Sequence, residues 1–243
     1  MYQRVLLIFS LFIFSITACK QEKVSLNQVD FKSNLINQEI SDNKEMNSFI
    51  DPYKTKLDKE MNQVIATVDE DLVISKPNNL LGNFLCDLSL DIVKKNGFDA
   101  DLVVMNNGGL RAPIYKGDIT NRSAFKLMPF DNMLVIVTMK GEAMTEMFEY
   151  LAKFQEPTNG LTLGIKNKKP IHPMINGKKF DPNKEYKVVT SDYLYTGGDQ
   201  MFFFQKGSKM VKTDLLIRDS IIDYCKAKKV IKVEHNKRLY YVK

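Results

Sequence analysis

The chain has 243 residues, of which 26% are charged, and a formal net charge of +6 at pH 7. Its basic residues are scattered and do not alternate with aromatic residues along a predicted helix face, which argues against a nucleic-acid-binding protein. After a polar N-terminal stretch about 190 residues remain without an internal linker, enough for one domain with a substantial core.

Residues 1–18 predict an export signal. Arg4 supplies a positive start, Val5 to Ile16 is an apolar run, and small residues precede Cys19. The run is too short to favour a transmembrane helix, which needs about 20 apolar residues. Removal of this leader takes Arg4 away and lowers the net charge by one, from +6 to +5.

The stretch Ile16-Thr-Ala-Cys19 resembles the lipobox of bacterial lipoproteins. The resemblance implies cleavage before Cys19 and lipidation of this cysteine, while a plain secretory signal cut near Ala18 is the alternative. Lys20 and Gln21 follow, and the absence of an Asp directly after Cys19 implies, by the same resemblance, the outer membrane or its periplasmic face. We therefore expect an exported lipoprotein held at a membrane.

Residues 19–47 are rich in Asn, Gln, Ser, Lys and Glu, which predicts a polar tether, and residues 48–243 are expected to form the domain. An amphipathic helix is predicted at the start of the domain from apolar residues that recur every three or four positions: Ile50, Tyr53, Leu57, Met61 and Ile65.

Periodicity and turn residues predict the later elements in chain order. Strands are expected over 71–75, 102–105, 133–139, 161–165, 186–190 and 238–242, with hairpin-type turn residues at 175–177. Helices are expected from Leu80 to a stop at Gly97, from Asn121 to Met128, after Gly141, and from Thr213 to Lys228, with a short turn before the second, over 114–120. Met144, Met147, Phe148 and Leu151 form the apolar face of the third helix, which indicates core packing.

A buried strand over 102–105 runs directly into Asn106-Asn-Gly-Gly-Leu-Arg111. A guanidinium presents five donors in a rigid fork, and neighbouring glycines let a ligand approach the main chain closely. The motif therefore predicts a site for carboxylate, phosphate or hydroxyl oxygens, although a plain loop with a surface Arg has the same pattern.

Cys86 and Cys225 both lie in helix-like apolar patterns. They could form one disulfide, but buried free thiols are the favoured interpretation, because a small apolar cysteine packs well in a core. The two histidines, His172 and His235, stand in no metal-binding or nucleophile motif, so we expect ordinary surface or hydrogen-bonded roles for them.

Three motifs stand in a fixed order: 106–112 with 117–120, then Pro129-Phe-Asp-Asn132, then Ser191-Asp-Tyr-Leu-Tyr-Thr-Gly-Gly-Asp199. Together they resemble the C-terminal, substrate-binding domain of the 5'-nucleotidase family, and the similarity covers about Ser75 to Val242. The resemblance implies an α+β fold of layered mixed sheets flanked by helices. Residues 48–243 would then be a substrate-binding domain of this kind.

The resemblance also implies a site. Phe130 and Tyr193 would stack on the two faces of a nucleobase, and a carboxylate such as Asp199 can accept two ribose hydroxyls. Read without the resemblance, the two aromatics would fit a core and Asp199 a turn. The full set of implied substrate-binding residues is Arg111, Phe130, Asn132, Tyr193, Asp199, Asn106, Gly108, Gly109, Gly198 and Lys76.

Two positions depart from the family pattern. Lys76 stands where family members commonly carry an Arg, and it offers a point charge in place of a bidentate fork. Tyr193 stands in place of the more usual Phe, which keeps the stacking face and adds a hydroxyl.

The family's hydrolytic chemistry resides in a metallophosphatase domain rich in His, Asp and Asn ligands, and two histidines cannot build that site. We expect no catalytic residue, no cofactor and no metal on this chain, and divalent metals on a partner metallophosphatase chain. No Ser or Cys nucleophile motif takes their place.

Three functions fit these observations. The first is the nucleoside- or nucleotide-binding half of a split 5'-nucleotidase that acts with a separate metallophosphatase chain, so that the chain alone is inactive. The second is a free-standing nucleoside- or nucleotide-binding lipoprotein. The third is a surface interaction protein whose pocket is no longer used. A neighbouring metallophosphatase gene would favour the first, and binding without such a gene the second.

Overall fold

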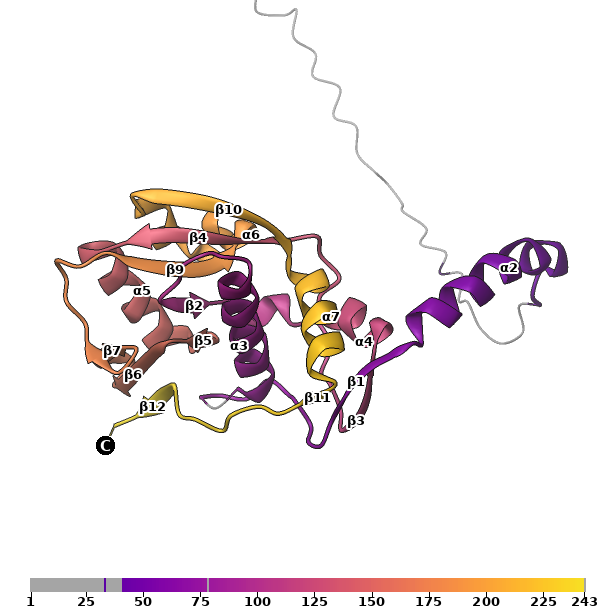
Figure 1. Ribbon diagram of the computed structural model, residues 1–243, viewed down its shortest axis with the longest axis horizontal. Helices are drawn as coiled ribbons and strands as arrows, with labels where there is room; N and C mark the ends of the chain where they lie inside the picture. Colours follow the sequence, from indigo (N-terminus) through magenta and orange to yellow (C-terminus); the bar gives the residue numbers. More distant parts are fainter. Residues whose placement is uncertain (1–32, 34–40, 78, 243) are drawn as a thin grey trace, which may run out of the picture. The chain divides into compact units, whose positions relative to one another are not determined.

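The computed structural model describes residues 33, 41–77 and 79–242 of the chain (Figure 1). The chain divides into two units after residue 48, and the fold described below belongs to the second unit, residues 49–243. The predicted leader, Cys19 and most of the predicted tether lie outside the described residues. Within the described ranges no helix is both long and apolar enough to cross a membrane.

The helices are α2 (Lys44–Met61), α3 (Leu80–Lys95), α4 (Asn121–Leu127), α5 (Gly141–Phe154), α6 (Asp192–Tyr195) and α7 (Ile217–Lys228), with short 3-10 turns η1 (Asn107–Gly109), η2 (Gly198–Gln200) and η3 (Phe202–Lys206). The strands are β1 (Val64–Val68), β2 (Leu102–Val104), β3 (Gly117–Thr120), β4 (Met133–Met139), β5 (Thr158–Asn159), β6 (Leu161–Lys166), β7 (Lys169–Ile175), β8 (Lys178–Lys179), β9 (Tyr186–Ser191), β10 (Lys209–Leu216), β11 (Val230–Ile231) and β12 (Leu239–Tyr241).

Helix ends coincide with capping residues. The Asn79 side chain accepts the Gly82 N–H at 2.8 Å, which caps the start of α3. Thr120 and Ser123 form a capping box at the start of α4. Gly97, with a φ of +82°, follows the end of α3 as the sequence predicts.

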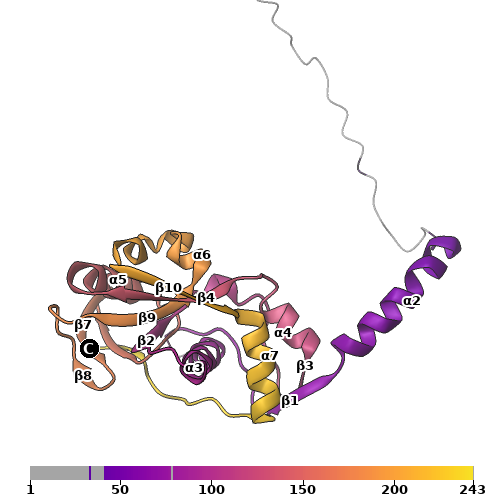
Figure 2. The same ribbon diagram turned by 45° about the horizontal axis from the view of Figure 1, so that its top comes forward.

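A five-stranded sheet in the order β10-β4-β9-β2-β5 separates two hydrophobic cores. Successive strand residues point to opposite faces, so Val103, Ile136 and Val189 pack with α3 and α7, while Val104 and Val188 pack with α5. Figure 2 shows α3 and α7 on one side of this sheet and α5 on the other. The predicted α+β fold with mixed sheets and flanking helices is confirmed.

Two smaller sheets complete the domain, β11-β1-β3 and β12-β6-β7-β8. β1 is antiparallel to β3 and parallel to β11, and β12 is parallel to β6. The C-terminal segment therefore connects the two small sheets, as the yellow trace in Figure 1 shows.

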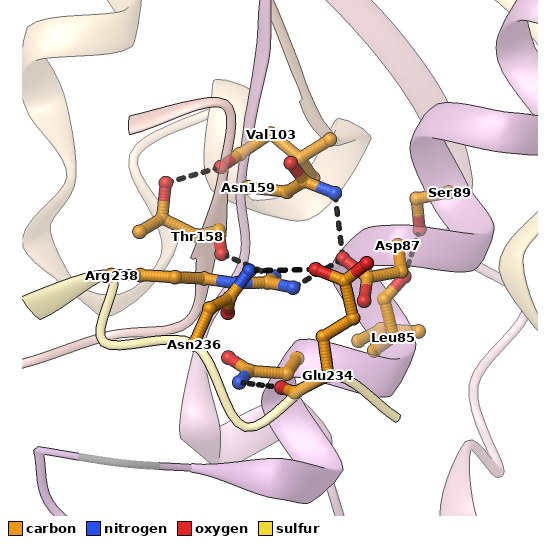
Figure 3. Close-up of polar contacts among 10 residues, drawn as sticks. Leu85, Asp87, Ser89, Val103, Thr158, Asn159, Glu234, Asn236 and Arg238 are labelled. Atoms are coloured by element: carbon orange, nitrogen blue, oxygen red, sulfur yellow. Dashed lines mark hydrogen bonds and ion pairs between the residues drawn. The ribbon is translucent and has the colours of Figure 1, made fainter. Parts of the chain in front are cut away.

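A polar cluster fastens this C-terminal segment to the domain (Figure 3). The Arg238 guanidinium pairs with the Asp87 carboxylate of α3 at 2.6 Å and donates to the Thr158 carbonyl at 2.7 Å. Asn159 donates to the same Asp87 oxygen at 2.6 Å. Arg238 is 9% exposed, so the pair holds a buried charge in place over the core.

Several predicted elements differ. Residues 71–75 form no strand but a single bridge, Leu72 with Ile114. Residues 213–216 belong to β10, because Leu216 pairs with Met133 of β4, so the last helix begins at Ile217. The turn predicted before α4 is the strand β3, because Gly117–Thr120 pairs with β1. In each case a distant segment supplies hydrogen-bond partners for the backbone N–H and C=O groups, and a local sequence pattern does not reveal that partner.

Two further expectations have clear outcomes. No residue of α2 is buried, and most of its apolar residues, Tyr53 and Leu57 among them, are exposed, so α2 adds nothing to the described core. Cys86 and Cys225 are free and buried, which confirms the interpretation as thiols.

Candidate functional site

The topology brings the three sequence motifs to one edge of the five-stranded sheet. β2 and β9 are parallel neighbours, so η1 and α6, which follow them, leave the sheet at the same carboxyl edge. β4 runs antiparallel to β9 and pairs Leu134 with Ser191, so the residues before β4 arrive at that edge too. Loops at the carboxyl ends of parallel strands are the usual position for ligand sites.

A cavity of about 720 Å³ lies between these loops. Its buried apolar lining comes from Leu85, Met105, Met128 and Ile217. The rest of its wall is made of polar and aromatic residues from the three motifs. Such a cavity has the size and the mixed character of small-molecule sites.

The structure places eight of the ten predicted residues around this cavity: Asn106, Gly108, Gly109, Arg111, Phe130, Asn132, Tyr193 and Asp199. Gly198 and Lys76 do not line it. These residues come from segments up to about 90 positions apart in the sequence, and the fold brings them together around one cavity.

Phe130 and Tyr193 are not core aromatics. Their side chains are 44% and 45% exposed, and both face the cavity. The guanidinium carbon of Arg111 lies 5.9 Å from the centre of the Phe130 ring, a cation–π contact that orients both side chains. Asn132 donates from its amide to Asp192 at 2.9 Å, which fixes the direction of the Asn132 side chain.

Asp199 is the centre of a hydrogen-bond network. Its Oδ1 accepts the Tyr193 hydroxyl at 2.9 Å and its Oδ2 accepts the Asn106 amide at 2.6 Å. The bond to Asp199 raises the pKa of the Tyr193 hydroxyl, so this group stays protonated at neutral pH. The hydroxyl that distinguishes Tyr193 from a Phe therefore ties the aromatic wall to the carboxylate.

The glycines allow close approach of these groups. A Cβ on Gly109 would lie 3.0 Å from the Asn106 side chain, and one on Gly108 would lie 3.2 Å from Asp199 Oδ2. Gly198 lies behind the Tyr193 ring, where a Cβ would overlap three ring atoms. Gly198 thus supports the pocket from outside and does not face a ligand.

Lys76 has a different position from the one predicted. Its ammonium donates to the carbonyl oxygen of Phe154 at 2.7 Å, at the C-terminal end of α5. Helix C-termini carry unpaired carbonyls and a partial negative charge, so a lysine is stabilising there. Lys76 therefore caps a helix instead of lining the cavity as a substitute for the family's Arg.

Two residues near the pocket were missed by sequence reasoning. Tyr150 donates to the Asp199 carbonyl at 2.7 Å, and Glu156 accepts the Asn107 N–H at 2.5 Å. Tyr150 belongs to an amphipathic helix and Glu156 follows its end, so neither stands in a motif. Asp131 also lines the cavity and pairs with Arg218, and it was assigned no role from the sequence although it stands in the motif over 129–132.

Within the residues that the structure describes, no group of three or more His, Cys, Asp or Glu side chains could hold a metal ion. The cavity is lined by donor groups, the amides of Asn106 and Asn132 and the Arg111 guanidinium, and by acceptor carboxylates, of which Asp199 already accepts from two neighbours. This set suits hydrogen bonds to hydroxyl and ring atoms of a ligand whose planar ring stacks on an aromatic side chain of the cavity wall.

A family model described as "5'-nucleotidase, C-terminal domain" matches residues 64–206. The chain is 30% identical over 204 residues to the trifunctional nucleotide phosphoesterase protein YfkN of Bacillus subtilis, covering 73% of this chain and 14% of that protein. It is 28% identical over 178 residues to protein UshA of Escherichia coli, covering 68% and 31%. The chain thus spans about a third or less of the length of these relatives.

Solved structures share the fold. The 5'-nucleotidase precursor from Thermus thermophilus aligns with a TM-score of 0.70 at 23% identity, over 80% of this chain and 42% of that chain. A putative 5'-nucleotidase from Staphylococcus aureus aligns with a TM-score of 0.67 at 16% identity, over 85% and 45%.

Proposed function

Because the chain belongs to the 5'-nucleotidase C-terminal domain family, we propose that it is the nucleoside-binding half of a split 5'-nucleotidase. In this role it holds the base and ribose of a nucleotide, while a separate metallophosphatase chain supplies the divalent metals and hydrolyses the phosphate ester. The process it serves is nucleotide catabolism outside the cytoplasm.

The observation that carries the proposal is the cavity that Phe130 and Tyr193 both line. Two exposed aromatic rings line one cavity beside a carboxylate, an amide and a guanidinium. Base–aromatic stacking contributes about 1 to 3 kcal/mol per base and accepts any base, because every base has a π-face. Asp199, Asn106 and Arg111 are the groups that would bond the ribose and the polar atoms of the base.

Two observations support the proposed division of labour. The described residues include no cluster that could hold a metal, and the chain spans about a third or less of the relatives it matches. Two-metal phosphate hydrolysis would need ligands beyond those of the described residues, and in this proposal a separate chain supplies them. Holding the nucleoside so that the phosphate reaches those metals would be a contribution of proximity and orientation.

The proposed location is a membrane surface outside the cytoplasm. The support is the sequence over Ile16 to Cys19, which resembles a lipobox after a short apolar run. A lipid on Cys19 would hold the chain at the outer membrane or its periplasmic face, and the polar residues 20–47 would separate the domain from the lipid.

The test of binding is calorimetric titration of the chain from Lys20 onwards with adenosine and with AMP, without added metal. We expect saturable binding of both, and a loss of about tenfold or more in affinity for Tyr193→Ala and for Arg111→Ala. Absence of heat with either ligand would contradict a nucleoside pocket on this chain.

The test of the division of labour is phosphate release from AMP with added Mn²⁺ or Zn²⁺. We expect none from the chain alone, and release above that of the phosphatase alone when a metallophosphatase chain from the same cells is added. Hydrolysis by this chain alone would overturn the split arrangement. Adenosine binding without any such stimulation would support a free-standing binding protein.

A further inference from the structure

The end of α5 contacts both loops that form the cavity. Tyr150, in the last turns of this helix, donates its hydroxyl to the main-chain carbonyl of Asp199 at 2.7 Å. Glu156, two residues after the helix, accepts the main-chain N–H of Asn107 at 2.5 Å. The last turns of α5 and the residues directly after it thus contact the main chain of both η1 and η2.

We infer that Tyr150 and Glu156 are positioning residues for the nucleoside pocket, and this inference rests on the proposed function of that pocket. Neither residue lines the cavity. They act through Asn106 and Asp199, whose side chains do line it and bond each other at 2.6 Å. The bonds of Tyr150 and Glu156 to the main chain add to that side-chain contact in fixing the relative placement of the two loops.

Asp199 needs external support because of its backbone. Its φ of +50° lies in the left-handed region, which is unfavourable for a residue with a side chain. The Tyr150 bond to its carbonyl fixes this peptide and so directs the carboxylate towards Tyr193 and Asn106. Because the Tyr150 hydroxyl bonds the main chain, this bond does not depend on the side chain at position 199.

Tyr150 is itself held firmly. Its ring packs against Phe154 and Phe203, with ring centres 4.5 Å and 5.5 Å away. Burial, helped by the nearby negative charges of Glu156 and Asp199, raises the pKa of Tyr150 to about 12. The hydroxyl therefore remains a donor throughout the neutral range.

Glu156 is surrounded by a second set of contacts to the same loop. The Gln155 carbonyl accepts the Asn107 side-chain amide at 3.3 Å, and Asn79 donates to the Asn107 side-chain oxygen at 2.5 Å. Lys76 caps α5 nearby, and its charge acts on the Glu156 carboxylate. The helix cap, the glutamate and the ligand loop form one connected unit.

Burial raises the pKa of Glu156, while the Asn107 N–H and Lys76 lower it and Asp199 raises it. A raised pKa means that ionised Glu156 opposes folding: its contribution to stability is present below the ordinary value of 4.5 and is lost as pH rises through the raised value. Glu156→Gln should therefore leave the melting temperature at pH 7 unchanged or higher. A positioning role therefore predicts that Glu156→Gln lowers adenosine affinity without lowering the melting temperature, whereas a merely structural role predicts that the melting temperature falls.

The experiment compares adenosine affinity and melting temperature for four single variants of the chain from Lys20 onwards. Tyr150→Phe removes the donor hydroxyl, and Glu156→Gln replaces the charged acceptor of the Asn107 N–H by a neutral, weaker one. Tyr186→Phe and Asp71→Asn are the matched controls, since Tyr186 accepts the Asp181 N–H at 3.0 Å and Asp71 accepts the Lys116 N–H at 2.8 Å, away from the cavity. We expect losses of about fivefold to tenfold for the first two and less than about twofold for the controls.

Two further measurements separate positioning from general damage. In an Asp199→Ala background, Tyr150→Phe should cause no further loss of affinity, because the carboxylate it places is gone. Amide hydrogen exchange should be faster over 106–111 in Glu156→Gln and over 197–201 in Tyr150→Phe, and unchanged there in the controls.

The outcomes are distinct. Unchanged exchange, or faster exchange with unchanged adenosine affinity, would overturn the inference while the proposed function stands. Absence of adenosine binding by the wild-type chain would overturn the proposed function, and the exchange data would still decide whether Tyr150 and Glu156 hold the two loops.

Discussion

Gly198 and Tyr193 show how closely single residues of the pocket are fitted together. A Cβ on Gly198 would come within 3.0 Å of three atoms of the Tyr193 ring, whose hydroxyl bonds Asp199. The ring, the glycine and the carboxylate therefore hold one another in place. The Tyr193 side chain can be 45% exposed and still have a defined orientation.

Gly198→Ala should displace the Tyr193 ring, because the new methyl group occupies its position. We expect adenosine affinity to fall about tenfold and the free energy of unfolding to fall by about 1 to 3 kcal/mol, measured by calorimetry and urea denaturation. In a Tyr193→Ala background the same substitution should have little effect. An equal loss in both backgrounds would show that the strain lies elsewhere.

The two cysteines should be unreactive in the folded chain. Burial raises the pKa of Cys225 to about 12 and raises that of Cys86 as well, so the reactive thiolate is scarce at pH 8. Ellman's reagent should react slowly with the chain from Lys20 onwards and should titrate two thiols after unfolding in guanidinium. Detection of none after unfolding would instead indicate a disulfide.

At the scale of helices and strands, the site depends on where elements end. β2 and β9 run parallel and β4 arrives antiparallel beside β9, so three separate loops meet at one sheet edge. The C-terminal segment closes the domain by spanning from β11 to β12 across α3. Arg238 joins this segment to Asp87 of α3 and to Thr158 of β5, and β5 and β12 belong to different sheets.

Arg238→Met should destabilise the domain, because it leaves the half-buried Asp87 carboxylate without its cation (Figure 3). We expect the free energy of unfolding to fall by about 3 kcal/mol in urea denaturation. Arg122→Met is the matched control, since the side chains of Arg122 and Asp58 are 36% and 43% exposed. That change should cost less than about 1 kcal/mol. Equal losses would mean that burial of the pair contributes nothing.

At the scale of the whole molecule, the proposed function separates nucleoside binding from phosphate chemistry. The described residues hold a cavity suited to a nucleoside and no cluster suited to a metal. A binding half without catalytic ligands is useful where a partner is near, and attachment to one membrane surface would raise the effective concentration of both chains.

Cys19→Ser tests the anchoring of the full chain. The wild-type chain, expressed in bacteria, should be recovered in the membrane fraction and should incorporate labelled palmitate, because a lipidated cysteine binds the bilayer. Cys19→Ser should incorporate none and leave the membrane fraction. A wild-type chain without label would support the plain secretory signal.

The sequence by itself determined the family, the α+β class and the longer helices, because apolar periodicity and capping residues are local signals. It also determined eight residues that the structure brings around one cavity, because they lie in motifs whose glycines and polar residues stand at strand ends. These signals need only a few neighbouring positions to be recognised.

Only the tertiary structure decided how the pocket is supported. The bonds of Tyr150 to Asp199 and of Glu156 to Asn107 each join residues 49 positions apart, and no local pattern marks such a pair. The same holds for Lys76, which caps α5, and for β10, whose pairing with β4 overrides a helical pattern. Long-range pairing depends on where folded elements meet, and the local periodicity of a sequence does not contain that information.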